Sequence, residues 1–254
     1  MDAHGSKPAE LPNIHGLPLA EDPWLSREMK RPVYQVRLSA TTSTVAEPQA
    51  GSFLYARLPQ DALIEAGELI RRGFSLVEVS VALDMDPVAA PPSEMSVGLS
   101  VRRASERDVD VISDIARRSL IHSRFHRDPA IDPVAASGVK SAWAANLARG
   151  DRGIACWVVE TDGHVIGFLG VTAVARRAPT AAIDLIATDP DYRGTGAGTA
   201  LVEELRRWAA ANGFAISTGT QLNNISAVRF YEARGFRFGS SEVILHAHLG
   251  SSVN

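Results

Sequence analysis

The carboxy-terminal part of the chain alternates between short apolar runs, which predict strands, and apolar residues three and four positions apart, which predict helices. Ser105 and Asp108 have the spacing of a capping box at the start of a helix. Asp162-Gly163, between two apolar runs, predicts a tight hairpin. The predicted elements are a strand at 98–103, helices at 105–122 and 133–149, strands at 154–161, 164–174 and 181–188, a helix through Leu201 and Trp208, a strand at 214–220, a short helix and a last strand. This order, β-α-α-β-β-β-α-β-α-β, predicts a mixed α/β domain.

Upstream of residue 98 the pattern is different. Residues 1–31 are rich in Pro, His, Gly and charge and have no sustained periodicity, so a flexible or loosely docked tail is expected. Residues 32–86 contain two apolar strand patterns and a helix, which we interpret as a small α/β domain. Prolines within residues 87–97 indicate a linker. Residues 98–254 are then the larger domain.

A helix-to-strand unit occurs twice in the chain. Arg72-Gly73-Phe74 follows a helical pattern and precedes a strand pattern, as Arg234-Gly235-Phe236 does near the carboxy terminus. We interpret the small amino-terminal domain as a partial, degenerate copy of the carboxy-terminal unit.

The segment from Arg193 to Gly198 is a glycine-rich turn between a strand and a helix. Its three glycines permit a tight turn and expose consecutive backbone N–H groups, and the following helix favours an anion at its start. The glycine spacing fits neither the phosphate loop of nucleoside triphosphatases nor the dinucleotide fingerprint. Taken alone, the segment is either an anion cradle or ordinary turn chemistry.

A second motif follows one strand later and combines with this turn. It consists of Asn224, Ala227, Phe230, Tyr231, Gly235 and Phe236. Together, R-x-x-G-x-G and N-x-x-A-x-x-F-Y-x-x-x-G-F resemble the GNAT family of N-acetyltransferases. The resemblance implies an α/β (α+β) GNAT fold, with a central mixed and mostly antiparallel sheet flanked by helices. The amino-terminal domain would be a smaller, degenerate GNAT-like part.

The resemblance implies acetyl-CoA as the co-substrate and assigns its binding residues. The turn would wrap the pyrophosphate with backbone N–H groups, and the exposed backbone of one strand would pair with the pantetheine arm. The residues implied are Ile186, Thr188, Arg193, Gly194, Thr195, Gly196, Ala197, Gly198, Asn224 and Ala227.

Tyr231 occupies the position at which many family members place a tyrosine beside the coenzyme A sulfur. A phenol with a pKa of about 10 is suited to protonate a departing thiolate. The alternative is that Phe230 and Tyr231 are both aromatic core residues of a helix, which is the role we favour for Phe230.

The acceptor is suggested by a narrower resemblance. The stretch SRFH, a following DP turn and W-x-x-N before a glycine, together with GFSLVEVSVAL upstream, resemble the subgroup that acetylates nucleotide-linked amino sugars such as TDP-fucosamine. That subgroup implies Glu78 as the residue backing the water that deprotonates the amine. On the predicted strand, Glu78 shares a face with Leu76 and Ser80. A carboxylate there either lines a pocket or is solvated.

Arg124, His126 and Arg127 follow the first helix, where family members build an acceptor wall. Arginine offers bidentate hydrogen bonds to a diphosphate, so these residues are predicted to bind the acceptor. The alternative is an ordinary polar loop. Trp143 either stacks on a base or belongs to the core.

Composition narrows the classes of partner. A net charge of −3 with scattered arginine pairs argues against a nucleic-acid binder. The single cysteine, Cys156, excludes an intrachain disulfide and is expected to be a buried structural thiol. No His and Cys spacing typical of a metal site appears, and no apolar run is long enough to cross a membrane. No signal peptide is expected, so the predicted location is cytoplasmic. A homodimer through Ser240 to Leu249 is an option.

Three functions are compatible with these observations. The first is an N-acetyltransferase acting on a dTDP-linked amino deoxysugar, a small-molecule acceptor. The second acetylates a protein amino terminus or an aminoglycoside. The third is a non-catalytic, coenzyme A-binding regulatory module.

Overall fold

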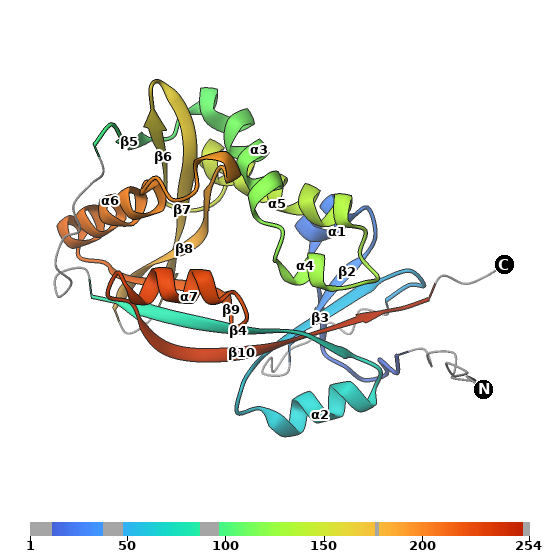
Figure 1. The fold of residues 1–254 in the computed structure, drawn as a ribbon. Coiled ribbons are helices and arrows are strands. Elements are labelled where there is room, and N and C mark those ends of the chain that lie inside the picture. The colour runs from blue at the N-terminus through green and yellow to red at the C-terminus, as the bar shows by residue number, and fades with distance from the viewer. Residues whose placement is uncertain (1–11, 38–47, 87–96, 176–177, 251–254) are drawn as a thin grey trace, which may run out of the picture. The chain divides into compact units, whose positions relative to one another are not determined.

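A computed structural model describes residues 12–37, 48–86, 97–175 and 178–250 (Figure 1). The chain forms two compact units, one of Met1–Glu78 with Glu242–Asn254 and one of Val79–Ser241. It passes between them within β4 (Ser75–Met85) and within β10 (Arg237–His248).

The boundary predicted at residues 87–97 therefore needs correction, although all of that segment except Val97 lies outside the described residues. The second unit begins at Val79, inside β4. The reason is strand pairing, since β4 residues from Ser80 to Met85 pair with β9 (Ala215–Gln221) of the second unit.

The first unit contains a small sheet and two helices. Its strands lie in the order β1, β2, β3, β10, with β2 and β3 parallel and the other two pairs antiparallel. Residues 242–248 of β10 pair with β3, so this edge of the terminal strand is already occupied within the chain rather than available to a second copy. The remaining elements are β1 (Leu19–Glu21), α1 (Pro23–Met29), β2 (Val33–Val36), β3 (Phe53–Pro59) and α2 (Leu63–Arg71).

The prediction of a tail at residues 1–31 is corrected for the part that forms β1 and α1, whereas residues 1–11 lie outside the described residues. Asp22 caps α1 by accepting a hydrogen bond from the Leu25 N–H at 2.9 Å, and Pro23 occupies the first turn. Leu17, Leu19 and Leu25 are buried. Three leucines spaced too irregularly to give a periodic signal thus hold this segment in the unit.

The ends of α2 and α7 (Ile225–Glu232) have the same backbone conformation, as the repeated Arg-Gly-Phe predicts. Gly73 and Gly235 have φ angles of 94° and 87°. In each copy, the N–H of the phenylalanine that follows the glycine donates to the carbonyl of the residue five positions earlier. Phe74 donates to Leu69 in the first copy, and Phe236 donates to Tyr231 in the second. Leu69 therefore takes the place of Tyr231, and the first copy lacks the phenol.

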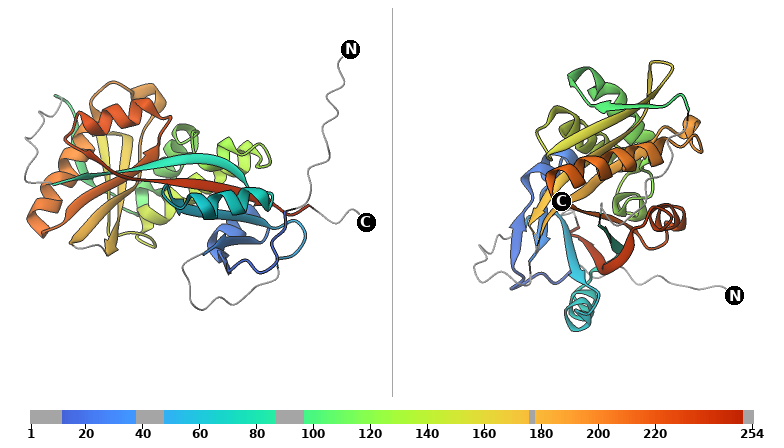
Figure 2. Two further views of the ribbon diagram at one scale, coloured as in Figure 1. Left: turned by 90° about the horizontal axis from the view of Figure 1, so that it is seen from below. Right: turned by 90° about the vertical axis from the view of Figure 1, so that its left-hand side faces the viewer.

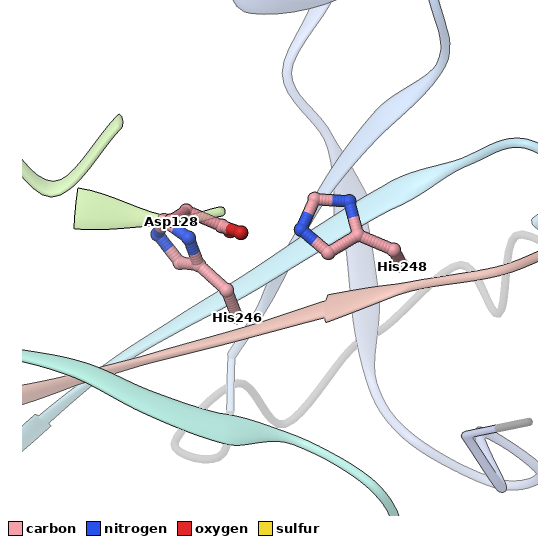
Figure 3. A group of neighbouring side chains, drawn as sticks. All are labelled: Asp128, His246 and His248. Atoms are coloured by element: carbon pink, nitrogen blue, oxygen red, sulfur yellow. The ribbon is translucent and has the colours of Figure 1, made fainter. Parts of the chain in front are cut away.

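Two histidines of β10 lie on the same side of the strand (Figure 3). In the first unit, Phe53 of β3 contacts both, with ring centroids 4.7 Å from His246 and 5.1 Å from His248. A guanidinium nitrogen of Arg31 lies 3.2 Å from Nδ1 of His248. These contacts pack the end of β10 against β3.

The second unit has the element order predicted from residue 98 onward, with one addition, the short helix α4. Its strands lie in the order β4, β9, β8, β7, β6, β5. The chain-ordered elements are β5 (Ser100–Arg103), α3 (Val109–Ser119), α4 (Arg124–Arg127), α5 (Pro133–Arg149), β6 (Ala155–Thr161), β7 (His164–Ala175), β8 (Pro179–Thr188) and α6 (Ala197–Asn212), followed by β9, α7 and β10.

Helices cover both faces of this sheet (Figures 1 and 2). Alternation along β6 explains the arrangement, because Trp157 packs with α6 on one face while Cys156 and Val158 pack with α3 and α5 on the other. Burial raises the pKa of the Cys156 thiol to about 12, consistent with a structural residue. The hairpin turn predicted between β6 and β7 is confirmed by positive φ angles at Asp162 (48°) and Gly163 (77°).

The predicted capping box is confirmed and carries a buried ion pair. The Asp108 carboxylate accepts hydrogen bonds from the backbone and hydroxyl of Ser105, each at 2.8 Å, and from both terminal nitrogens of Arg102, at 2.7 and 2.8 Å. Glu160 shares the same guanidinium at 2.5 Å. This network ties the start of α3 to β5 and β6.

Asp108→Asn should lower the free energy of unfolding by about 2–4 kcal/mol. The substitution removes the carboxylate that pairs with the part-buried Arg102 guanidinium, and it weakens the cap of the helix. The Arg102 guanidinium holds the pKa of Asp108 well below its usual range. A depressed pKa gives stability that is present above the unfolded value of about 4 and is lost as the pH falls below it. The mutant's deficit should therefore be full at pH 7 and shrink in acid, as measured by urea denaturation. Asp114→Asn, which breaks only exposed pairs, should cost under about 1 kcal/mol.

Candidate active site

β8 and β9 separate part of the way along the sheet. Their parallel pairing ends at Ile183 and Thr218, whereas β7 continues to pair with β8 as far as Thr188. The N–H of Asp189 donates to the Ile166 carbonyl on the β7 side, at 2.8 Å. Because backbone groups alternate along a strand, those of Ile186 and Thr188 point to the side where β9 has moved away. β8 therefore presents an open edge at the two residues predicted to pair with an extended ligand.

A cavity of about 580 Å³ lies along this opening. Of the residues predicted from the sequence, those that line it are Ile186, Thr188, Arg193, Gly194, Gly198, Asn224, Ala227 and Tyr231. Thr195, Gly196 and Ala197 belong to the same turn without lining the cavity.

The glycine-rich turn has the backbone geometry of an anion cradle. Gly194 and Gly196 have φ angles of 80° and 91°, and Gly196 is the N-cap of α6 without any capping side chain. The first N–H groups of the helix are thus left for a ligand. A Cβ on Gly198 would lie 3.1 and 3.2 Å from two ring carbons of Phe230. The turn therefore leaves backbone N–H groups open at the start of α6, with Phe230 of α7 packed against Gly198.

Arg234 fastens α7 to the first turn of α6. Its guanidinium lies over the Phe230 ring, 3.6 Å from the centroid, and donates to the Phe230 carbonyl at 2.6 Å and to the Thr199 hydroxyl. Burial lowers its pKa. One side chain therefore links the cradle to the helix carrying Tyr231, and the sequence pointed to it only as part of the repeated Arg-Gly-Phe unit.

Asn224 is the N-cap of α7. Its Oδ1 accepts from the Ala227 N–H at 3.3 Å and from the Ser226 hydroxyl at 2.9 Å. The cap uses the side-chain oxygen, so Nδ2 is the atom oriented for a ligand.

Tyr231 reaches the cavity wall although only 4% of it is exposed. Phe230 and Phe236 contact its ring edge-to-face at 5.3 and 5.2 Å. Burial raises the pKa of Tyr231, and the neighbouring Thr218 hydroxyl offsets part of the shift. Thr218 Oγ1 is itself buried and lacks a hydrogen bond of regular geometry. The phenol is thus kept protonated beside a polar atom that a ligand can satisfy.

The cavity is also lined by residues that the sequence did not identify. Lys140 of α5, His122 and Ser123 lie there, with Asp184 of β8. Two signals were available, because Lys140 is the only charged residue between Pro133 and Ala148 and Asp184 interrupts an apolar strand. Neither pattern predicts which part of the structure the side chain of Lys140 or Asp184 contacts.

The three residues predicted to bind the acceptor lie on α4 and do not line this cavity. Arg124 stacks on Phe125, with its guanidinium carbon 4.4 Å from the ring centroid. His126 lies between the hydroxyls of Ser123 and Ser137, at 2.8 and 3.0 Å. Arg127 is exposed. The structure thus places Ser123, next to the predicted cluster, rather than the cluster itself on the cavity wall.

Glu78 is the last residue of the first unit, on β4. Its side chain is buried, with 6% exposed, so it is not solvated, but it is not among the residues that line the 580 Å³ cavity. Trp143 is half-buried against the core of α3 and α5, and its indole N–H donates to Asp184 at 2.8 Å.

An open strand edge, a side-chain-free turn before α6 and a buried tyrosine on α7 are the features of the GNAT class of acetyltransferases. Residues 118–236 match the model of the "Acetyltransferase (GNAT) family". Residues 118–236 are therefore a GNAT acetyltransferase domain, and members of this family use acetyl-CoA.

Three comparisons place the chain among known proteins. It is 27% identical over 261 residues to Spore coat polysaccharide biosynthesis protein SpsD of Bacillus subtilis (strain 168), covering 96% of this chain and 88% of that protein. It is 39% identical over 69 residues to Streptothricin acetyltransferase A of the same organism, covering 27% of this chain and only 40% of that enzyme. A solved GCN5-related N-acetyltransferase from Kribbella flavida has the same fold, with a TM-score of 0.59 at 15% identity over 93% of this chain and 90% of the other. Among the described residues, no helix is long and apolar enough to span a membrane.

Proposed function

We propose that this protein transfers an acetyl group from acetyl-CoA to the amino group of a nucleotide-linked amino deoxysugar, dTDP being the expected carrier. The observation that carries the proposal is the continuity of the cavity. The open edge of β8 and the turn at α6 line it, and so do Lys140, His122 and Asp184, which we assign to the acceptor end. Donor and acceptor can occupy it together, which favours direct attack in a ternary complex over an enzyme-bound acetyl intermediate.

Acetyl-CoA supplies an acetyl thioester whose carbonyl carbon accepts the amine. The backbone N–H groups of β8, at Ile186 and Thr188, are positioned to hold an extended amide chain and to stabilise a developing oxyanion. Asn224 Nδ2 and the turn at Arg193 to Gly198 hold the remainder of the donor. The Tyr231 hydroxyl gives its proton to the sulfur as the carbon–sulfur bond breaks, and the carbon–nitrogen bond forms.

The acceptor class is supported by two independent similarities. One is the motif resemblance to enzymes acting on nucleotide-linked amino sugars. The other is the relative named for spore coat polysaccharide biosynthesis, which spans most of both chains. The local likeness to an enzyme named streptothricin acetyltransferase favours a second candidate, an aminated antibiotic.

A thiol-release screen with acetyl-CoA tests the proposal. The acceptors should include 3-amino and 4-amino dTDP and UDP sugars, streptothricin, an aminoglycoside and a peptide with a free amino terminus. We expect the highest kcat/KM with a dTDP-linked amino sugar. If only streptothricin, the aminoglycoside or the peptide is acetylated, the proposal of a nucleotide-linked sugar is wrong. Binding of coenzyme A without thiol release from any amine would favour a non-catalytic module.

Glu78 is proposed to back the water that takes the amine proton, on the strength of the subgroup resemblance and its burial. Glu78→Gln should lower kcat/KM about 100-fold near neutral pH, because a general base contributes typically 10²–10⁴-fold. The loss should lessen as the pH approaches the pKa of the acceptor amine. Glu65→Gln, an exposed acid in the first turn of α2, is the matched control and should leave kcat/KM unchanged. A loss of less than a few-fold would contradict the assignment.

A further inference from the structure

The acceptor end of the cavity is lined by positive charge. Lys140 is half-buried, and its Nζ lies 4.6 Å from the centroid of the Trp143 ring and 6.0 Å from that of Phe125. Aromatic faces on two elements, α5 and α4, thus hold the ammonium group near the cavity wall. His122 lines the same end and is exposed.

Asp184 is the single carboxylate among the described residues that line the cavity, and its charge is largely matched. Arg152 donates to its two oxygens at 2.5 and 3.1 Å, and Trp143 donates to one of them at 2.8 Å. Only 12% of the Asp184 side chain is exposed. With that carboxylate committed to a bidentate arginine, it offers little attraction to a cationic acceptor.

His126 of α4 lies close to the same positive charges. Its pKa is lowered, first by burial and then by the charges of Lys140 and His122. Lys140 and His122 therefore both add positive charge around this part of the cavity lining. An anionic ligand is favoured there and a cationic one is disfavoured.

We propose that Lys140, assisted by His122, binds a negatively charged group of the acceptor, of the phosphate or diphosphate class, and determines acceptor specificity. The inference rests on the proposed function, because it assigns the acceptor to this end of the cavity. Lysine serves as a point-charge phosphate ligand. The arginines of α4 do not line the cavity. We therefore expect Lys140, and not those arginines, to be the cationic partner of the acceptor.

Steady-state kinetics of Lys140→Met and Lys140→Arg with a dTDP-linked amino sugar test the proposal. Lys140→Met should raise the acceptor KM about tenfold or more, the usual loss for one hydrogen bond to a charged group. The KM for acetyl-CoA and kcat should stay within about twofold, since only ground-state acceptor binding is removed. Lys140→Arg should retain most of the affinity. Arg149→Met removes an exposed charge from the same helix and should change nothing. An unchanged acceptor KM in Lys140→Met, or an equal rise in Arg149→Met, would overturn the assignment.

A binding measurement separates this inference from the proposed function. Calorimetry should follow dTDP binding to protein saturated with coenzyme A, so that the donor cradle is already filled. If no nucleotide-linked sugar is acetylated yet Lys140→Met weakens dTDP binding about tenfold, the anion site stands and the proposed reaction fails. If such a sugar is acetylated but Lys140→Met binds dTDP as the wild type does, the reaction stands and the role of Lys140 is refuted.

Discussion

Replacing Tyr231 by phenylalanine should lower kcat about 100-fold or more while the KM for acetyl-CoA changes little, because the phenol acts on the departing sulfur rather than on donor binding. The ring keeps its packing against Phe230 and Phe236, so only the hydroxyl is lost. Initial rates of thiol release measure the effect. Tyr34→Phe removes a hydroxyl from a buried tyrosine of the first unit and should leave kcat unchanged.

The pH profile distinguishes an acid from a packing residue. Burial raises the pKa of Tyr231 above its usual value of about 10, so the phenol is protonated throughout the neutral range. As the pH rises through this elevated pKa the donor is lost, and wild-type kcat should decline only there. The Tyr231→Phe variant should lack that alkaline decline. Equal kcat for mutant and wild type at every pH would reduce Tyr231 to a core aromatic.

Gly198→Val should raise the KM for acetyl-CoA about tenfold or more, the loss expected when one charge-assisted contact to the donor is disturbed. The new Cβ would lie 3.1 Å from a Phe230 ring carbon, closer than ordinary contact. Phe230 cannot yield freely, because Arg234 lies on its ring and is bonded to Thr199 in the same helical turn. The cradle of backbone N–H groups must therefore shift.

Gly138→Val provides the control for helix propensity. Gly138 is an exposed glycine within α5, and a Cβ there would meet nothing within 4 Å. Its KM for acetyl-CoA should equal that of the wild type. A Gly198→Val enzyme with unchanged KM and normal thermal unfolding would show that the contact with Phe230 does not shape the donor site.

The cavity residues proposed to bind the donor could be found from sequence because they lie in two short motifs that also shape the local backbone. Glycines at 194, 196 and 198 are required by positive φ angles and by the approach of Phe230. Asn224 is at once a helix cap and a cavity residue. Where one residue serves both local conformation and ligand binding, the spacing of residues in the motif is enough to predict the site.

The limits of prediction were clearest for the acceptor and for the amino-terminal segment. The charged cluster on α4 was the most prominent candidate, yet Arg124 stacks on Phe125, His126 bonds to serines and none of the three residues lines the cavity. Lys140 was unremarkable in a helix of small residues. The segment at 19–29 lacked periodicity but forms β1 and α1 around a capped turn.

The sequence by itself determined the order of elements in the second unit, the hairpin at Asp162-Gly163, the cradle before α6 and the position of Tyr231. These depend on φ angles, caps and periodicity, which act over a few residues. Only the tertiary structure decided three features. These are the point at which β9 separates from β8, the ion pair between Asp184 and Arg152, and the position of Lys140 on the cavity wall. Those outcomes depend on packing between elements far apart in the chain, such as Trp143 and Asp184, for which no local spacing holds information.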